Sequence, residues 1–452
     1  MVDNSDPAST TDAKEASAEV TSPAEFALIW LSGPLAGTPL NLSWAGSREL
    51  TIGRDAECAI HLANTDVSRQ HAALRRNDSD SGVSIADLSS RNGTRVNGRP
   101  VQSAHLQEND VVRVGGCVFV VGDTPTSFSE VAPDLHGSAS LKRALAPLPK
   151  VARSDLSIVL EGETGTGKEL VARAIHTLSG RPGKLVAINC AALPQGLAEA
   201  ELFGYRRGAF TGAERASPGF FRAAEGGTLL LDEVSELPLG LQAKLLRALE
   251  QKAVQPLGEP APVPVDVRIV VAGQSSLFEA VKRQQFRADL LARLNGVTLH
   301  LPPLRARRAD ILLLFSHFLR TLRTGALPRF EPELVERLAL YDWPFNVREL
   351  LQLARRLSVL QGAEAVLRAQ HLPREMGLEV ESSGPTLAPP VHPPEAPAAI
   401  DLARLLTALR ATGGNVTRAA AQLRITRQRA YRLLEEQSVD LATLSGPRRS
   451  KR

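Results

Sequence analysis

Cysteine and aromatic residues are both scarce in this chain of 452 residues. The three cysteines, Cys58, Cys117 and Cys190, are scattered and form no metal-ligand spacing. This argues against a disulfide scaffold and indicates free thiols in a reducing compartment. Aromatic residues make up 4% of the chain and hydrophobic residues 43%, so we expect cores built from Leu, Val, Ala and Ile.

Long hydrophobic runs are absent as well. No apolar stretch approaches the roughly 20 residues that a membrane helix needs, and the polar N-terminus has no apolar signal core. We therefore expect a soluble, cytoplasmic protein without a membrane partner. Residues 1–24 are polar and partly acidic, which predicts a disordered tail.

Positive charge is concentrated at one end of the chain. The net charge is +4 overall, but residues 401–452 contain 11 Lys and Arg against 4 Asp and Glu, which makes that segment +7 and leaves −3 for the rest. A basic segment of this kind indicates an anionic partner for the C-terminal part.

Hydrophobic patterning divides the chain into several domains. Residues 25–123 contain short alternating runs separated by Gly, Asn and Asp, which predict an all-β sandwich. In residues 134–376, the buried-strand runs LSIVLEG, LVAIN, TLLLDE and VRIVVAG alternate with helical patterns, which predicts a parallel α/β sheet with a helical part from about 304. Proline-rich residues 377–398 predict a linker, residues 399–441 are helical, and residues 442–452 form a basic tail.

A phosphate-binding motif follows the first of these strands. The motif comprises Gly162, Glu163, Thr164, Gly165, Thr166, Gly167, Lys168 and Glu169, between a predicted strand and a predicted helix. This is the P-loop pattern, in which backbone N–H groups converge on phosphates and Lys168 supplies a positive charge. Glu169 occupies the position where a Ser or Thr generally binds magnesium, which leaves the metal site open at this point.

Two acids end a later strand. The run GGTLLLDE places Asp232 and Glu233 at the C-terminal end of a buried strand, where open α/β sheets bind their ligands. Asp232 would help to hold Mg²⁺, and Glu233 would polarise the attacking water. A solvated acidic turn is a common alternative for one such motif, but it accounts poorly for both motifs in this order.

Six segments carry a family resemblance. GETGTGKE, INCAALPQGLAEAELFGYRRGAFTGA, GGTLLLDE, FRADLLARLN, LPPLRARRADI and WPFNVREL resemble, in order and spacing, the AAA+ ATPase domain of sigma-54-dependent transcription activators. The resemblance implies hydrolysis of ATP with Mg²⁺ by a homo-oligomer, a hexamer when active, that remodels RNA polymerase holoenzyme carrying sigma-54. Glu after the P-loop lysine is usual in that family, which removes the objection raised by Glu169.

The resemblance also implies roles for individual residues. Asn189 corresponds to the asparagine that switches the catalytic glutamate, and Arg348 to the sensor-II arginine of the lid. Arg287 and Arg293 correspond to arginine fingers that reach the nucleotide of a neighbouring subunit. For each arginine taken alone, a surface salt bridge is the alternative. The sigma-54 contact loop of the family matches the hexapeptide Gly208, Ala209, Phe210, Thr211, Gly212 and Ala213.

Three positions depart from the family pattern. Gly273-Gln274 replaces the sensor-I Thr-Asn pair, Phe345 replaces the glycine of the lid motif, and Ala288 replaces a glutamate. These departures keep an alternative function open, in which the chain is a phosphopeptide- and DNA-binding regulator with weak or no ATP turnover.

The N-terminal segment resembles a second family. Gly53-Arg54, Ser68-Arg69-Gln70-His71 and the run from Ser90 to Gly98 resemble the FHA domain, a phosphothreonine reader. Arg54 and Arg69 can bind a phosphate, Ser68 can donate its hydroxyl, and Asn92 can hold the peptide backbone. His71 is expected to be structural. The alternative is a sandwich whose Asn-Gly turns are only hairpins. The implied partner is a phosphothreonine-containing protein, with a Ser/Thr kinase as the source of the signal.

The C-terminal segment contains two short helical patterns with a tight connection. TRAAAQL and TRQRAYRLLEEQ predict a helix-turn-helix and resemble the Fis-type DNA-binding domain that ends this activator family. The second helix carries Arg427, Gln428, Arg429 and Arg432, whose side chains suit base edges and phosphates. The implied partner is DNA upstream of a promoter.

Overall fold

The computed structural model describes residues 26–44, 47–76, 82–122, 128–194, 196–274, 276–323, 325–362, 364–376 and 409. The predicted N-terminal tail, proline-rich linker, helix-turn-helix and basic tail thus lie outside the described residues, apart from Leu409. No described helix is long and apolar enough to cross a membrane. The three predicted free cysteines are unpaired and buried.

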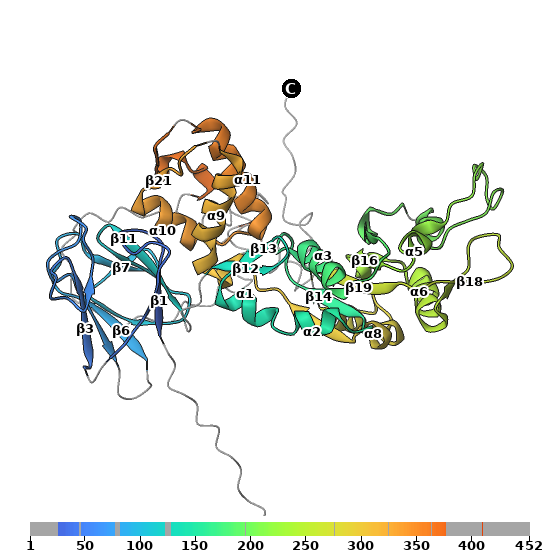
Figure 1. Ribbon diagram of the computed structural model, residues 1–452, viewed down its shortest axis with the longest axis horizontal. Helices are drawn as coiled ribbons and strands as arrows, with labels where there is room; N and C mark the ends of the chain where they lie inside the picture. The colour runs from blue at the N-terminus through green and yellow to red at the C-terminus, as the bar shows by residue number, and fades with distance from the viewer. Residues whose placement is uncertain are drawn as a thin grey trace, which may run out of the picture. The chain divides into compact units, whose positions relative to one another are not determined.

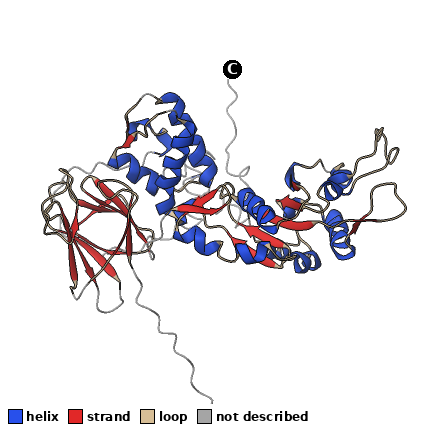
Figure 2. Cartoon of the chain, in the orientation of Figure 1, coloured by secondary structure: helices blue, strands red, loops and turns tan. Residues whose placement is uncertain are grey.

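Two antiparallel-rich sheets form the predicted N-terminal sandwich (Figures 1 and 2). The first sheet has the order β2 (Pro39–Asn41), β1 (Ala27–Trp30), β11 (Cys117–Gly122), β10 (Val111–Val114), β7 (Thr94–Val96) and β8 (Arg99–Val101). The second has the order β4 (Ile60–His61), β3 (Glu49–Gly53), β5 (Ala72–Arg76), β6 (Val83–Asp87) and β9 (Ser103–Leu106). Trp30 and Phe119 meet inside, with ring centroids 4.7 Å apart.

A hairpin and two short helices connect the sandwich to the α/β domain. The hairpin consists of β12 (Ser129–Ala132) and β13 (Leu135–Gly137), and the helices are α1 (Ala139–Ala144) and α2 (Leu148–Ala152). Ala132 and Leu135 pack into the same apolar core as the helix after the P-loop. The hairpin therefore borders the nucleotide site.

Five parallel strands form the predicted α/β sheet. Their order is β15 (Leu185–Asn189), β16 (Thr228–Asp232), β19 (Arg268–Gly273), β14 (Ile158–Glu161) and β20 (Val297–His300). The four strands expected from the sequence are confirmed. The fifth strand, β20, was not expected, because this short edge strand buries only Leu299 fully and lacks the continuous apolar run of the others.

Alternate residues along the strands face two separate cores. Ile158, Leu160 and Val270 face the core with α1, α2 and α3 (Lys168–Ser179), whereas Val159 and Val271 face the opposite core. The second core is covered by α4 (Ala198–Phe203), α5 (Gly219–Ala223), α6 (Leu239–Gln251), α7 (Leu277–Lys282) and α8 (Ala288–Leu294). A sheet buried on both faces explains why its strands appear in the sequence as continuous apolar runs.

Three helices form the predicted lid, shown in orange in Figure 1. They are α9 (Arg308–Leu322), α10 (Pro332–Leu340) and α11 (Asn346–Leu360), preceded by the 3-10 helix η3 (Leu304–Ala306). Pro332 starts α10, where a missing backbone N–H costs nothing. Trp343 is fully buried between α10 and α11 and donates its indole N–H to the carbonyl of Leu338 at 2.9 Å.

Candidate functional site

The P-loop connects β14 to α3. Gly165 and Gly167 have φ values of +80° and +108°, which glycine adopts without strain. A Cβ atom at Gly165 would lie 2.1 Å from the carbonyl oxygen of Phe345, so only glycine fits this approach of the lid. The loop ends on the N-terminus of α3, whose unpaired N–H groups and dipole favour a phosphate.

Lys168 is the charged group of this loop. Its side chain is buried, and its ammonium donates to the carbonyls of Gly162 at 2.7 Å and Glu163 at 3.3 Å. Burial lowers the pKa of Lys168, while the negative charges of Asp232 and Glu233 act in the opposite direction. The structure thus brings the P-loop lysine and the two predicted acids into one electrostatic environment.

The two acids end the neighbouring strand β16. Glu233 has a φ of +52°, an uncommon conformation for a non-glycine residue and one of a kind that concentrates at functional sites. Its backbone N–H donates to the Asp232 carboxylate at 3.1 Å. Asn189 ends β15 directly beside Asp232 in the strand register, and its side chain accepts from the N–H of Ala191 at 2.9 Å. Asn189 is therefore adjacent to the acidic pair.

Sensor I was expected at Gly273-Gln274. Gly273 ends β19, between the P-loop strand and the acidic strand, and its carbonyl accepts from the N–H of Gly162 at 3.2 Å. Gln274 follows at the same edge and is exposed. Gly273 has no side chain for a nucleotide, but its backbone supports the start of the P-loop.

The lid closes on the P-loop through a set of contacts that sequence reasoning missed. Buried Asn346 donates to the Glu163 carboxylate at 3.2 Å and to the Thr164 carbonyl at 3.0 Å. The N–H of Val347 donates to the Gly165 carbonyl at 3.0 Å. Asn346 lies close to Arg348 in the motif WPFNVREL, and this position in the sequence could have identified it as a residue that contacts the P-loop.

Glu163 turns its side chain toward the lid. Arg305 donates both terminal nitrogens to the Glu163 carboxylate, one of them at 2.7 Å. These bonds from Arg305, with a further one from Asn346, hold the pKa of the Glu163 carboxyl below its usual value. Glu163, one of the predicted ATP-binding residues, therefore affects the shape of the loop through the bonds of its carboxylate. Its backbone carbonyl accepts a hydrogen bond from Lys168.

The predicted arginines divide into two groups. Arg348, in the first turn of α11, lies beside Gly165 and within electrostatic reach of Lys168. Arg287, which caps α8, pairs with Asp289 at 2.6 Å, and Arg293 donates to the carbonyl of Leu249 at 3.3 Å. In the described part of the chain, neither Arg287 nor Arg293 bonds to the P-loop or to the acidic pair.

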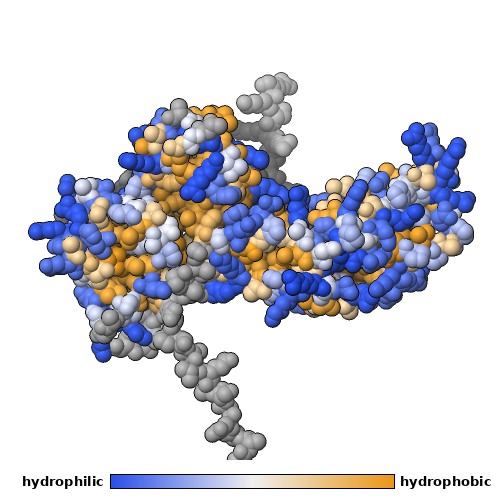
Figure 3. Space-filling model, viewed as in Figure 1, coloured by the Kyte–Doolittle hydropathy of each residue, from blue (hydrophilic) through white to orange (hydrophobic). Residues whose placement is uncertain are grey.

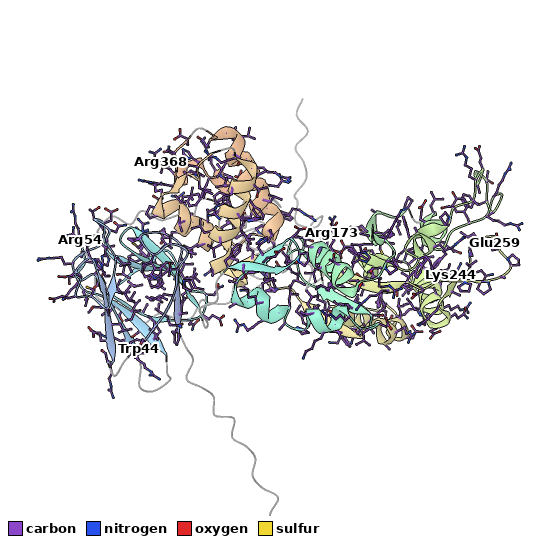
Figure 4. The ribbon with its side chains drawn as sticks, viewed as in Figure 1. Trp44, Arg54, Arg173, Lys244, Glu259 and Arg368 are labelled. Carbon is purple, nitrogen blue, oxygen red and sulfur yellow. The ribbon has the colours of Figure 1, made fainter. Side chains whose placement is uncertain are left out.

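The donor set at this edge suits magnesium. Asp232 offers a carboxylate close to Lys168, and Mg²⁺ is generally held by one or two carboxylates together with phosphates and water. Glu169 does not take part, because its carboxylate faces outward along α3 and pairs with Arg173 at 2.8 Å. Figure 4 shows Arg173 at the surface of that region.

The predicted sigma-54 contact loop projects from the α/β domain beyond α5, in green in Figure 1. The N–H of Gly208 donates to the carbonyl of Ala213 at 2.9 Å, and Gly208 and Gly212 have φ values of +80° and +97°. Phe210 is 37% exposed and lies against Tyr205, with ring centroids 5.0 Å apart. In Figure 3 the surface around the projecting loops is mostly hydrophilic.

A second loop, which sequence reasoning missed, supports the first. It connects β17 (Ala253–Val254) with β18 (Val263–Pro264). The N–H of Arg206 donates to the Leu257 carbonyl at 3.0 Å, and the N–H of Leu257 donates to the Gly204 carbonyl at 2.9 Å. Figure 4 shows Glu259 on this loop and Lys244 on α6. The proline-rich run between Gln255 and Pro264 was the available signal.

The predicted phosphopeptide residues gather on loops of the sandwich. Arg54 and Arg69 are exposed, and Figure 4 shows Arg54 at the sandwich surface. The Ser68 hydroxyl accepts from the N–H of Arg91 at 3.0 Å, and Asn92 donates to the Asp66 carbonyl at 2.7 Å. Backbone bonds from Arg54 to Ser68 and from Asp55 to Arg69 bring the two motifs together. The four predicted residues therefore share one surface.

His71 is structural, as expected. It is fully buried, its Nδ1 accepts from the N–H of Ser68 at 3.1 Å, and its Nε2 donates to the Gly93 carbonyl at 3.1 Å. Only the neutral ring protonated at Nε2 can make both bonds. Burial lowers the pKa of His71 below 6.5.

This pKa shift predicts that the loops loosen in acid. The neutral ring is the bonded form, so its contribution is complete above pH 6.5 and is lost as the pH falls through the lowered pKa. We expect an NMR titration of the His71 ring to give a pKa below 6.5, with faster exchange of the Ser68 amide at the same pH. A ring that titrates at or above 6.5 would contradict the assigned tautomer.

The predicted DNA-binding residues Arg427, Gln428, Arg429 and Arg432 lie outside the described residues. Comparison with known families covers this part of the chain. The Fis family of bacterial regulatory proteins matches residues 396–433. The sigma-54 interaction domain matches residues 135–300, an AAA+ lid domain matches residues 305–388, and the FHA domain matches residues 50–115.

Similar proteins agree with these matches. The transcriptional regulatory protein ZraR of Salmonella typhimurium is 41% identical over 336 residues, which are 73% of this chain and 74% of that protein. The regulatory protein AtoC of Escherichia coli K12 is 40% identical over 300 residues, 65% of each chain. The crystal structure of NtrX from Brucella abortus in complex with ATP has a TM-score of 0.50 at 30% identity and covers 68% of this chain and 69% of that one.

These comparisons bear on the functions left open by the sequence. The sigma-54 interaction and lid domains are the two parts of an AAA+ ATPase, and they bear out the ATPase interpretation. The FHA and Fis domains confirm the modules expected at either end. The chain therefore belongs to the sigma-54-dependent transcription activators and combines their AAA+ ATPase with an FHA domain and a Fis-type DNA-binding domain.

Proposed function

We propose that the P-loop, the acidic pair and the lid residue Arg348 form the catalytic site of this activator. The observation that carries the proposal is the environment of Lys168, which lies in electrostatic contact with Asp232, Glu233 and Arg348. These four residues come from three separate segments. Lys168 would exchange the carbonyls of Gly162 and Glu163 for the β- and γ-phosphates of ATP. Arg348 would approach the same phosphates from the lid.

Each acid takes a distinct part in this proposal. Mg²⁺, when bound, would supply positive charge that offsets the negative charge developing during transfer. Asp232 would hold that ion, and Glu233 would accept a proton from the attacking water. Asn189, adjacent to the acids at the end of β15, would orient the Glu233 carboxylate.

The site is proposed to be completed by a second copy of this chain. Arg287 and Arg293 lie at either end of α8 and are exposed, and in the described structure they bond to Asp289 and to the Leu249 carbonyl. A guanidinium stabilises transition-state charge when a neighbour inserts it. We propose that these residues serve the adjacent subunit in a ring, with a hexamer as the active form.

The remaining modules supply the input and the output. The loop carrying Phe210 would contact sigma-54, and the surface formed by Arg54, Ser68, Arg69 and Asn92 would bind a phosphothreonine. The source of that signal would be a Ser/Thr kinase acting on a partner protein. The residues Arg427, Gln428, Arg429 and Arg432 would contact upstream DNA.

Replacing Lys168 by alanine tests the site directly. We expect Lys168→Ala to weaken the binding of a fluorescent ATP analogue by about 10- to 100-fold, since a charge-assisted bond to phosphate is lost. In vitro transcription from a sigma-54 promoter should then fail. Lys150→Ala, at an exposed position on α2, is the control and should bind as the unmodified chain does. Unchanged affinity in Lys168→Ala would refute the assignment.

A further inference from the structure

The sheet β1–β11–β10 of the FHA domain is apolar on both faces. Leu28, Val112 and Phe119 point into the sandwich core. On the outer face, Ile29, Leu31, Val111, Val118 and Val120 belong to the apolar cluster of the lid. Helix α10 contacts β10 and β11, and α9 contacts β11. An antiparallel sheet with one face in water would alternate apolar and polar residues. The consecutive apolar residues of β1 and β11 thus indicate a covered outer face.

A buried ion pair accompanies this apolar contact. Arg113 of β10 donates to the Glu336 carboxylate of α10 at 2.9 Å, and the Glu336 side chain is 5% exposed. A carboxylate buried to this extent needs its partner, because an unpaired buried charge is strongly destabilising. The FHA domain is therefore docked on the lid by specific contacts as well as apolar ones.

Asn109 extends the docking to the start of the lid. It lies in the turn before β10 with a φ of +74°. Its amide group donates to the Arg305 carbonyl at 2.6 Å, and its side-chain oxygen accepts from the N–H of Arg308 at 2.9 Å. One carboxamide thus binds both ends of the segment 305–308, which connects η3 to α9.

The same segment is bonded to the P-loop on its other side. The Arg305 side chain holds the Glu163 carboxylate, and Arg307 donates to the Thr166 carbonyl at 3.3 Å. Arg307 is buried and also lies 3.5 Å from the Asp310 carboxylate. Residues 305–308 are accordingly fixed between the FHA domain and the phosphate-binding loop.

We propose that Asn109 is a positioning residue for the nucleotide site. By fixing residues 305–308, it holds Arg305 against Glu163 and so makes the conformation of the P-loop depend on the docking of the FHA domain. The inference depends on the nucleotide site proposed for Lys168. Thermodynamic linkage then requires the converse, namely that bound nucleotide strengthens FHA docking by the same factor.

The docking face also connects to the phosphopeptide loops. Arg113 donates from Nε to the Gly115 carbonyl at 2.9 Å, and the N–H of Gly115 lies 3.5 Å from the Gly93 carbonyl that His71 bonds. His71 in turn accepts from the N–H of Ser68. A contiguous series of hydrogen bonds therefore connects the proposed phosphopeptide loops to α10.

Replacing Asn109 by glycine tests the proposal in the full chain. Glycine keeps the positive φ and removes both bonds to the segment 305–308. We expect Asn109→Gly to weaken the binding of a fluorescent ADP analogue by about 3- to 10-fold, the effect of one or two net hydrogen bonds. Glu108→Gln is the matched control, because neighbouring Glu108 forms an exposed ion pair with Arg143 and its substitution should leave the affinity unchanged.

A double-mutant cycle tests whether Asn109 acts on the nucleotide site through Arg305. Arg305→Lys keeps the positive charge, but a lysine ammonium cannot donate two parallel hydrogen bonds to the Glu163 carboxylate. If Asn109 acts through Arg305, adding Asn109→Gly to Arg305→Lys should cost little more than Arg305→Lys alone. Fully additive losses, or unchanged affinity in Asn109→Gly, would overturn the proposal.

With two further variants, each outcome of the experiment either supports or refutes the proposal. Lys168→Ala separates the hypotheses: if it binds nucleotide normally, the site itself is misassigned, whereas its failure beside a normal Asn109→Gly refutes only the present inference. Should Asn109→Gly unfold, as judged by near-UV circular dichroism, Asn109→Asp replaces it. Asp keeps the acceptor for Arg308 and loses the donor to Arg305, so a weakening of about threefold is expected and none would refute the proposal.

Discussion

Replacing Glu233 by glutamine is expected to leave ATP binding intact and to lower ATP turnover by about 10²- to 10⁴-fold. Glutamine has the same shape and can occupy the same backbone conformation, but its neutral amide cannot take a proton from water. The strained φ of +52° places this side chain at the end of β16, in electrostatic contact with Lys168. Loss of turnover with retained binding is therefore the signature of a base and not of a structural acid.

The control for this prediction lies three residues further on. Glu236 is an exposed acid of the 3-10 helix Val234–Glu236, and Glu236→Gln removes the same charge outside the proposed site. Turnover should be unchanged in this variant. Steady-state ATP hydrolysis and equilibrium binding of a fluorescent ATP analogue, measured on both variants, separate chemistry from affinity. Turnover in Glu233→Gln within tenfold of the unmodified chain would exclude Glu233 as the base.

Local motifs predict the P-loop and the strand that ends in two acids well, because each is specified by a short run. The P-loop requires glycine at positions whose φ is positive, and a buried strand that ends in two acids is visible as TLLLDE. Sequence periodicity also predicts the sheet, since both of its faces are buried. The edge strand β20 escapes prediction because it is short and only half-buried.

Contacts between segments that are far apart in the sequence are much harder to predict. Nothing in the sequence around Asn109 indicates that its side chain bonds to residues 305–308, almost 200 positions away. Asn346 and Arg305 lie in recognised motifs. The sequence does not show that both bond to Glu163, because these bonds form only when the lid is folded on the P-loop. Residues 25–123 were interpreted as alternating runs, but β1 and β11 consist of consecutive apolar residues. A strand with one face in water would alternate, so these two strands did indicate that the outer face is covered.

Replacing Phe210 by alanine is expected to abolish transcription activation while ATP hydrolysis continues. Phe210 is 37% exposed, and its only ring contact in the described structure is Tyr205, so truncation should change the free energy of unfolding by no more than about 0.5 kcal/mol. The closing bond from Gly208 to Ala213 is made by backbone atoms and survives the substitution. An aromatic anchor at the centre of an interface can carry about 2 kcal/mol or more, which corresponds to roughly a 30-fold loss of sigma-54 affinity.

The measurement pairs in vitro transcription from a sigma-54 promoter with ATP hydrolysis in the same preparation. Phe278→Ala is the matched control, because Phe278 is a 54% exposed phenylalanine on α7, in a segment apart from the projecting loops. Activation should persist in the control and disappear in Phe210→Ala, at equal rates of hydrolysis. Activation retained in Phe210→Ala would mean that the ring serves only to pack on Tyr205. A simultaneous loss of hydrolysis would instead place Phe210 among the residues that maintain the ATPase, since a residue that only contacts sigma-54 leaves hydrolysis unchanged.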